Sequence, residues 1–422
     1  MERFNVIIIG GGISGLVAGI EIRRQTRKSV LILEKGDSYE ARIASGSPDL
    51  IVGLGGAGTV CGGKLCYPPA SGTIWEKTRE EFKKNYAAAF AMYGAGKDLP
   101  RHKLIVDRVH SGAYYEKGYE SELISQQEMH AYIRDLISQA DECGVEIRVK
   151  SEMVEYKQES AGKVIHYLDE SRKDRTVCAD FLIFAGGRAS SPEIDRLLKQ
   201  VGVKEQMPDL GIRLQMPRSS AGLFQAVGRD VKLKMKYEDI LVRTFCVCSG
   251  GHLAQVRMGN NLYFDGHFDQ GISDSVNFGV LARSPELVGT KAALDYIEDY
   301  QNMVDQPISC KWFMENFSQL AKSDAHRRVF NAIVVFLDKL LETRAFGQDA
   351  DAINVYLPSV DRLNPHVITD SSFRTRDPFL YVIGDAAGIS RGFVQAQWSG
   401  FCAARGVITS LKEEEDSVIL CR

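Results

Sequence analysis

The sequence predicts an α/β protein in which a mixed α+β domain is inserted into a domain with a parallel sheet. Three observations lead to this fold class. A buried strand runs into a glycine-rich turn and a helix at the start of the chain. Between residues 203 and 360 the sequence changes to short segments in which apolar and polar residues alternate. A late apolar strand, ending in Gly-Asp at 384–385, brings the chain back to the first domain.

The N-terminal segment has the order of a dinucleotide-binding unit. Phe4–Ile9 is an apolar strand, and Gly10-Gly11-Gly12-Ile13-Ser14-Gly15 follows it directly. Gly10 allows a tight turn, Gly12 lets the backbone approach a pyrophosphate, and Gly15 lets helix and strand pack closely. The amides of Ile13, Ser14 and Gly15 would open the helix and present the positive end of its dipole to phosphates. The segment therefore predicts a Rossmann-type βαβ unit.

An acidic residue closes this unit. Glu34 follows the apolar strand Val30–Leu33, about 20 residues beyond the glycines, where a carboxylate accepts hydrogen bonds from an adenosine ribose. Lys35 beside it is a further candidate contact. The carboxylate would repel a 2′-phosphate, so the tightly held nucleotide is not expected to be NADP. A tight turn without a ligand would also explain the glycines, but strand, helix and distal acid together argue against it.

Composition and charge argue against several classes of protein. The chain has 422 residues, 44% of them hydrophobic, which predicts two closely joined domains with a full core. A formal charge of -3 and a pI near 6.3 give no basic field for nucleic acid. No apolar run is long enough to span a bilayer and no signal peptide is visible, so a cytoplasmic protein without a membrane partner is expected. The nine cysteines are scattered, without metal-site spacing, and are expected to be thiols.

A dense run of glycine, from Gly53 to Leu65, follows the first unit. Because such a run costs chain entropy, it is expected to make close backbone contact with a bulky ligand. Its candidate contacts are Gly56, Ala57, Gly58, Thr59, Gly63 and Lys64. An amphipathic helix over 128–143 and a strand over 145–149 then predict the third parallel strand. Val154, beyond that strand, is another candidate nucleotide contact.

The middle of the chain predicts two further groups of strands. Alternating segments at 153–158, 163–168 and 176–184 form a small meander that ends in Ala185-Gly186-Gly187, three small residues that suit close backbone approach to a ligand. Antiparallel strands are expected at 231–237, 240–248, 252–258, 261–264 and 276–282, with helices near 289–304 and 326–343. The expected division is a first domain over 1–202, an inserted substrate domain over 203–360 and a return over 361–422.

The return segment decides the expected cofactor. Pro378–Ile383 is a buried strand that runs into Gly384-Asp385, and an acid at the end of a parallel strand lies in the crevice where such sheets bind ligands. Asp385 would accept a hydrogen bond from a ribityl hydroxyl, although it could instead cap the following turn. FAD is long enough to need both ends of the chain. The first domain is therefore expected to be a Rossmann-type FAD-binding domain.

At this point the sequence resembles the glutathione-reductase-type class of FAD proteins, with Ala185-Gly186-Gly187 in place of the usual Ala-Thr-Gly-like strand end. More narrowly, it resembles the bacterial FAD-dependent dehydrogenases labelled NAD(FAD)-utilising. The resemblance covers most of the chain and is carried by three phrases: 53–59 with 63–65, Thr244–Gly251, and Gly384–Gly392. It implies flavin-mediated hydride transfer but no particular substrate.

Catalytic candidates come from these phrases. Arg391, Gly392, Phe393 and Val394 stand where a helix expected over 393–411 begins, and its free amides would face the flavin N1 and C2 carbonyl, where reduction places negative charge. Arg391 would add a positive charge, unless it is a surface or phosphate-contact arginine. Lys64 is a candidate for the flavin N5 edge or an anionic substrate, or is simply solvated.

The inserted domain offers fewer signals. Cys246 and Cys248 share one face of a strand, so they line the pocket or, the preferred interpretation, pack in the core; Cys248 is kept as a catalytic candidate. His252, Arg257, Tyr263 and His267 lie on the inserted sheet and could contact substrate.

Cys61 and Cys66 have the Cys-x4-Cys spacing of pyridine-nucleotide disulfide reductases. The second nucleotide fold and the C-terminal dimerisation domain of those enzymes are not recognisable here, so a redox disulfide at this pair is the less favoured interpretation.

The expected function is that of an FAD-dependent oxidoreductase that transfers a hydride through flavin N5 to or from a small organic substrate. NAD(P)H would visit at most transiently, because no second nucleotide domain is visible. An FAD-dependent monooxygenase is the main alternative. A non-catalytic FAD-binding or tRNA-modification partner is a third, disfavoured by the acidic balance. The substrate, the direction of reaction and the oligomeric state stay open.

Overall fold

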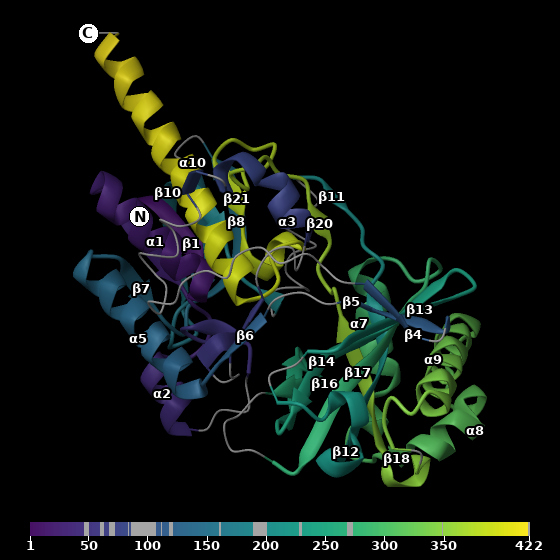
Figure 1. Cartoon of the computed structure of the whole chain (residues 1–422). Coiled ribbons are helices and arrows are strands. Elements are labelled where there is room, and N and C mark those ends of the chain that lie inside the picture. Colours follow the sequence, from purple (N-terminus) through teal and green to yellow (C-terminus); the bar gives the residue numbers. More distant parts are fainter. Residues whose placement is uncertain are drawn as a thin grey trace.

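The computed structural model describes residues 1–45, 50–59, 63–66, 72–82, 84–85, 107–110, 112–117, 121–159, 162–188, 201–227, 230–267, 273–347 and 349–420. Figure 1 shows two parts, one built on the N- and C-terminal segments and the other on the middle of the chain. Each part has its own hydrophobic core. This arrangement confirms the predicted fold class.

The first part is built on a sheet of five parallel strands. They are β1 (Glu2–Ile9), β2 (Val30–Leu33), β7 (Glu146–Arg148), β10 (Asp174–Phe184) and β21 (Leu380–Val382). The order is β7-β2-β1-β10, and β21 pairs with the far end of β10. Strands β2 and β21 are apolar throughout and buried on both faces, as strands covered by helices on both sides are.

Strand β10 is long enough to pair in both senses, so that β8 and β9 extend the five parallel strands into one mixed sheet of seven. Over Asp174–Ala179 it pairs antiparallel with β9 (Gly162–Leu168), which pairs with β8 (Glu152–Glu159). Over Leu182–Phe184 it pairs parallel with β21. The predicted meander and the predicted return strand are both confirmed, and β10 joins them.

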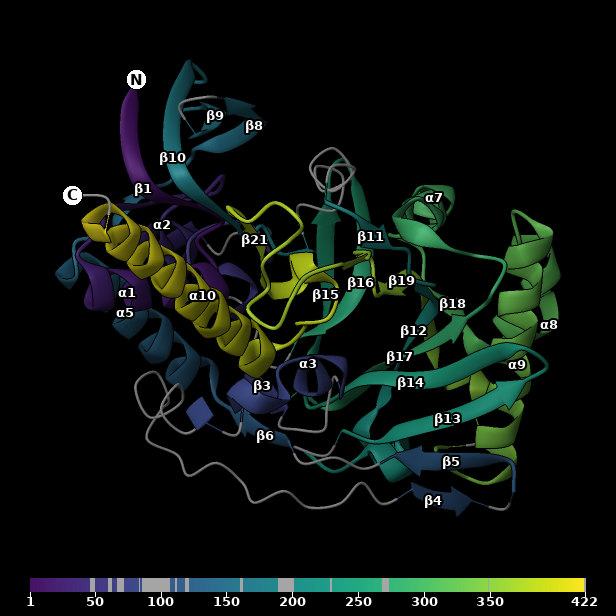
Figure 2. The same ribbon diagram turned by 90° about the horizontal axis from the view of Figure 1, so that it is seen from above.

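Helices cover this sheet (Figure 2). They are α1 (Ile13–Thr26), α2 (Tyr39–Ser45), α3 (Gly72–Lys77), α5 (Gln126–Glu142) and α10 (Phe393–Leu420). Helix α5 begins with a capping box between Ser125 and Glu128, which satisfies two backbone amides. Helices α1 and α10 pack closely because Gly400 has no side chain: a Cβ there would lie 2.3 Å from the Ser14 carbonyl oxygen.

The second part is an eight-stranded antiparallel sheet in the order β18-β19-β12-β17-β14-β13-β5-β4. Its strands, in chain order, are β4 (Asp107–His110), β5 (Tyr114–Lys117), β12 (Asp209–Pro217), β13 (Lys232–Tyr237), β14 (Ile240–Ser249), β17 (Ser275–Arg283), β18 (Ile308–Ser309) and β19 (Asn354–Asp361). Strands β4 and β5 come from residues that the sequence assigned to the first domain. The expected boundary at 202 therefore does not follow the sheets.

Among the described residues, three further helices and three small ribbons accompany the two sheets. The helices are α7 (Gly289–Asp299), α8 (Cys310–Leu320) and α9 (Asp324–Glu342), and α9 lays an apolar face that includes Val329, Ile333 and Phe336 against the second sheet. Helix α8 was not anticipated from the sequence. The ribbons pair β15 (His252–Met258) with β16 (Asn261–His267), β3 (Gly63–Cys66) with β6 (Ser121–Ile124), and β11 (Val203–Lys204) with β20 (His366–Val367).

Candidate functional site: a dinucleotide cradle facing a charged junction

The glycines of the N-terminal turn differ in their surroundings. A Cβ at Gly10, whose φ is +108°, would lie 2.4 Å from the Ala185 carbonyl oxygen, and one at Gly15 would lie 2.1 Å from the Gly10 oxygen. Both positions are therefore closed by packing. A Cβ at Gly12 would meet nothing nearer than 3.9 Å, so the backbone there borders open space. Gly12 is also the N-cap of α1, whose first turn has no acidic residue.

Three segments that are far apart in the sequence meet at this end of α1. The strand end at Ala185 touches Gly10. The Ile383 amide donates to the Phe184 carbonyl oxygen at 2.9 Å, which brings the Gly-Asp segment beside β10. A Cβ at Gly384 would lie 2.7 Å from the Ser14 hydroxyl oxygen. The glycine turn, the end of β10 and the start of the turn Gly384–Ala387 thus surround one helix N-terminus.

The Glu34 carboxylate accepts three backbone hydrogen bonds. Its Oε2 accepts from the Gly11 amide at 2.8 Å, and its Oε1 accepts from the amides of Gly36 at 2.8 Å and Gly53 at 3.0 Å. Glu34 therefore holds the glycine turn and the later glycine run together before any ligand is considered. Lys35 next to it is half-buried. Ser151, whose amide donates to the Glu34 carbonyl oxygen at 2.8 Å, is buried at the same strand end.

The glycine run contacts the N-terminal turn and is itself held in place by Arg42, a residue that sequence reasoning missed. Gly55 forms a parallel bridge with Gly12. The buried Arg42 guanidinium donates to the carbonyl oxygens of Leu54 at 3.0 Å and Gly56 at 2.9 Å, among others. Thr59 is fully buried, and its hydroxyl donates to the Leu54 oxygen at 3.2 Å. The sequence does not indicate that this isolated arginine, after the second strand, binds the carbonyl oxygens of the glycine run.

The acid at the end of the return strand contacts an arginine. Arg188, directly after Gly187, donates from Nε to Asp385 Oδ2 at 3.2 Å. Its Nη1 donates to the Tyr263 hydroxyl at 3.0 Å and to Asp265 Oδ2 at 3.2 Å. Burial raises the pKa of Tyr263 to about 12, so it stays a neutral phenol. Arg188 therefore links the predicted ribityl site of the first part to strand β16.

A second arginine extends this chain of contacts. Arg213, fully buried on β12, lies 3.5 Å from Asp265 through Nη1. It donates to Asn277 Oδ1 at 2.6 Å and to the Cys246 carbonyl oxygen at 2.9 Å, and its Nη2 lies 3.7 Å from Cys248 Sγ. Asp385, Arg188, Asp265, Arg213 and Cys248 thus form one continuous polar chain between the two parts of the molecule.

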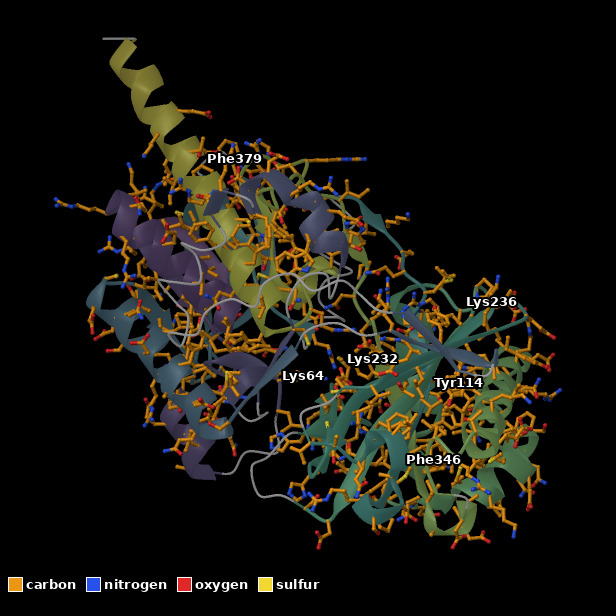
Figure 3. All side chains as sticks on the ribbon, viewed as in Figure 1. Lys64, Tyr114, Lys232, Lys236, Phe346 and Phe379 are labelled. Atoms are coloured by element: carbon orange, nitrogen blue, oxygen red, sulfur yellow. The ribbon has the colours of Figure 1, made fainter. Side chains whose placement is uncertain are left out.

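Lys64 does not stand alone in a loop. It lies on β3 and forms an ion pair with Asp230, which also pairs with Lys232 at 2.7 Å; Figure 3 places both lysines at the junction of the two parts. Burial alone would lower the pKa of Lys64, but the attraction of nearby Asp230 has the larger effect. The pKa of Lys64 is therefore raised, and the lysine stays charged. The solvated alternative for Lys64 is wrong, because its side chain is 15% exposed. A role toward flavin or substrate stays a prediction.

Arg391 belongs to a second buried network. It pairs with Asp361, which also accepts from Arg243 at 2.6 Å. Arg243 and Arg283 both contact Asp209, at 2.5 and 2.7 Å. Burial would raise the pKa of Asp209, but the two arginines hold it well below its usual value. Three cations, those of Lys232, Arg243 and Arg391, lie within 5.1, 4.9 and 5.4 Å of the Phe245 ring centre.

The remaining predicted residues lie as follows. Gly56 and Gly58 are half-buried and Ala57 is exposed in the turn Gly56–Thr59. Gly63 pairs with Ile124, and Gly186 is half-buried at the end of β10. A Cβ at Gly187 would meet nothing within 4 Å. Gly392 precedes α10, Phe393 lies 5.0 Å from the Tyr132 ring, and Val394 is buried. Val154 is 48% exposed on β8, whereas the backbone that meets Glu34 is that of Arg148 and Ser151. Cys61 lies outside the described residues.

The described residues fit a dinucleotide better than a packed turn. The α1 N-terminus is buried, its cap carries no side chain, and open space borders Gly12 and Gly187. Such a helix end binds a pyrophosphate through its free amides and its dipole. Carboxylates flank it at Glu34 and Asp385, which suits sugar hydroxyls.

The chain has similarities to known proteins at three levels. Residues 8–49 match the model of the NAD(P)-binding Rossmann-like domain. Over 209 residues, 50% of its length, the chain is 24% identical to LodB of Marinomonas mediterranea, whose name gives it as a candidate FAD-dependent oxidoreductase. The match covers 48% of LodB, so the chain spans about half the length of this relative.

Two solved structures resemble the chain more distantly. A flavoprotein/dehydrogenase from Cytophaga hutchinsonii is 12% identical with a TM-score of 0.47, covering 98% of this chain and 79% of that one. A geranylgeranyl bacteriochlorophyll reductase-like protein from Thermoplasma acidophilum is 14% identical with a TM-score of 0.48, covering 98% and 80%. Likenesses of this degree assign no activity. Within the described ranges, no helix has both the length and the apolar character that crossing a membrane requires.

Proposed function

We propose that the protein is an FAD-dependent oxidoreductase that transfers a hydride between the flavin and a small organic substrate. The observation that carries this proposal is the meeting of the glycine turn, the end of β10 and the Gly384-Asp385 segment at one buried helix N-terminus. A long nucleotide needs contacts from all three segments, and the partial similarity to LodB supports FAD as that nucleotide.

Within this proposal, the chain's own residues bind and orient the cofactor. The first amides of α1 hold the pyrophosphate, Glu34 accepts from the adenosine ribose, and Asp385 accepts from the ribityl chain. When bound, a flavin supplies the hydride chemistry at its N5 atom. With a flavin bound, the free amides at the start of α10, with Arg391 nearby, would stabilise the negative charge that develops on reduction.

The second sheet supplies the substrate side. The charged residues at the junction include Arg213 and Lys232 on this sheet and Asp265 on the neighbouring ribbon strand β16, all held in ion pairs. Fixed, paired charges of this kind orient a polar substrate without having to reorganise during the reaction. NAD(P)H would enter this space only transiently, as an electron donor.

The test is the identity of the bound nucleotide. Protein purified under mild conditions is expected to be yellow and to release FAD on heating, at about one FAD per chain. Colourless protein that takes up no FAD on incubation, or protein that releases NAD instead, would overturn the proposal. Mixing the reduced protein with oxygen addresses the monooxygenase alternative, because a slow and featureless return of the flavin absorbance fits the dehydrogenase.

A further inference from the structure

The register of the second sheet gathers cations on one of its faces. Lys234 of β13 pairs with Arg243 of β14, and Lys232 and Phe245 each lie two residues from this pair on the same strands. Side chains at paired positions, and at positions two residues apart, share one face of a sheet. The intervening Val242 belongs to the second hydrophobic core, on the opposite face. One face of the sheet is therefore apolar, and the other carries charge.

Phe245 is the centre of the charged face. The cations of Lys232, Arg243 and Arg391 lie 5.1, 4.9 and 5.4 Å from its ring centre, so any two of them are no more than about 11 Å apart. Arg391 comes from the first part of the molecule, so the ring is contacted from both parts. Shared carboxylates add two further cations. We call the Phe245 cluster the set of Lys64, Lys232, Arg243, Arg283 and Arg391 with Asp209, Asp230 and Asp361.

The three carboxylates do not neutralise this cluster. Each contacts two of the five cations, and Arg243 is shared between Asp209 and Asp361. Counted over the described residues, the cluster therefore carries two positive charges in excess. The neighbouring polar chain is balanced, because it joins two arginines to two carboxylates: Arg188, Arg213, Asp265 and Asp385. The excess positive charge of the junction is thus located around Phe245.

Arg362, which directly follows Asp361, adds to this excess. Its buried Nε has no hydrogen-bond partner among the residues that the structure describes. Burial and the nearby charges of Arg283 and Arg391 lower the pKa of Arg362, although Asp209 and Asp361 oppose them. An arginine whose pKa is lowered by other arginines lies in a region that an added anion would stabilise.

A ligand can reach these cations. The side chains of Arg243, Arg283 and Arg391 are 14%, 22% and 29% exposed. Such partial exposure allows contact, while partial burial limits the screening of the charges by water and salt. The pyrophosphate of the proposed cofactor is assigned to the N-terminus of α1, which is built from other residues. The cofactor's phosphates therefore do not account for the excess charge around Phe245.

We infer that the Phe245 cluster binds the anionic end of the substrate, and that this end is a dianion, either a phosphate monoester or a dicarboxylate. Guanidinium groups bind the oxygens of both through paired N–H donors, and a charge of two matches the excess. Arg391 directly precedes Gly392 and α10, so an anion held here lies beside the start of that helix. Calling this anion the substrate rests on the proposed function, whereas its binding does not.

Calorimetric titration of the purified protein with phthalate and with phenyl phosphate tests the binding. At about pH 8 both probes are dianions, and the ionic strength is held constant with chloride. Benzamide has a similar ring without a charge and is the neutral control. At least one dianion is expected to bind with a dissociation constant below about 1 mM, and the tighter of the two assigns the phosphate or the dicarboxylate. If neither binds more tightly than benzamide, the inference is wrong.

Two variants locate the bound anion. Arg283→Gln and Lys64→Gln each remove one positive charge, and each leaves the carboxylate concerned with its second cation. Each is expected to weaken binding of the dianion about tenfold. Lys291→Gln removes the same charge at a side chain that is 83% exposed and outside the cluster, and is expected to bind as the wild type does. Thermal unfolding shows whether each variant is folded, and two separate variants keep the test decisive. Equal affinity in all three would overturn the assignment.

The flavin separates this inference from the proposed function. In yellow protein, binding of the dianion is expected to change the visible absorbance of the flavin, and binding without such a change would overturn its role as substrate. Yellow protein that binds neither dianion contradicts the inference and leaves the proposed function intact. Protein that binds a dianion through Arg283 and Lys64 but takes up no FAD supports the anion site and contradicts the proposed function.

Discussion

Replacing Gly12 with aspartate separates a ligand site from a structural turn. Gly12 is the N-cap of α1, with φ of -74° and ψ of 179°, an extended conformation that any residue adopts. A Cβ there meets no atom closer than 3.9 Å. Aspartate is a favoured N-cap, and its charge suits the helix dipole, so the apo protein is expected to be unchanged or more stable by a few tenths to about 1 kcal/mol.

The same carboxylate would occupy the space in which the pyrophosphate is proposed to bind. Two like charges about 4 Å apart repel by roughly 4 kcal/mol at an effective dielectric constant of 20, which is about three orders of magnitude in the dissociation constant. Flavin content after purification and FAD titration of apo protein measure this loss, and thermal unfolding measures the cap. Gly12→Asn has the same shape without the charge and is expected to retain more FAD. A Gly12→Asp protein with full flavin content would refute the placement of the pyrophosphate.

Three further changes test the fold and the site. Gly400→Ala is expected to lower the free energy of unfolding, measured by urea titration, by about 1–3 kcal/mol, because a Cβ there would lie 2.3 Å from a backbone oxygen of α1. As a control, Gly19→Ala within α1, where a Cβ would have no neighbour nearer than 3.4 Å, is expected to be neutral or stabilising in the same titration. Asp209→Asn leaves two half-buried arginines without the buried carboxylate that they share and is expected to destabilise by about 3–5 kcal/mol. Since the pKa of Asp209 is lowered in the folded protein, its contribution to the free energy of unfolding is complete above the unfolded pKa of about 4 and is lost as the pH falls below that value. The difference in free energy of unfolding between wild type and variant should therefore narrow between pH 5 and pH 3. A constant difference would contradict this. Asp385→Ala is expected to yield protein with little FAD, whereas Asp370→Ala, at a carboxylate 41% exposed, should stay yellow; equal flavin content in the two would reject the ribityl role.

Local patterns predicted most of the elements. The first βαβ unit, the third parallel strand β7, the meander and the return strand β21 are each readable from apolar runs and glycine positions that lie close together in the sequence. The pairing of β5 with β13 joins residues more than 100 positions apart and has no such signature. Helix α8 was missed although its apolar residues, Cys310, Phe313, Met314, Phe317 and Leu320, have helical spacing.

The candidate site was predictable only where the backbone defines it. Glycine positions mark close approach in the sequence itself, so Gly10, Gly12 and Gly15 could be given separate roles. Arg213 could not be found, because an arginine in an alternating strand normally indicates a solvent face, and β12 is instead covered on both faces. Its partners, Asp265 and Asn277, lie more than 50 residues away and belong to other strands.

The charge balance of the junction bears on the proposed function. Among the described residues, its ion pairs involve seven cations, Lys64, Arg188, Arg213, Lys232, Arg243, Arg283 and Arg391, and five carboxylates, Asp209, Asp230, Asp265, Asp361 and Asp385. Four of these carboxylates are each shared by two cations, and Asp385 contacts Arg188. The seven cations outnumber the five carboxylates, so these residues carry an excess of positive charge where burial makes it effective. An anion is the species that such a region stabilises. Under the proposed function, the negative charge that develops on a reduced flavin is an anion of this kind, and these arginines and lysines would favour it.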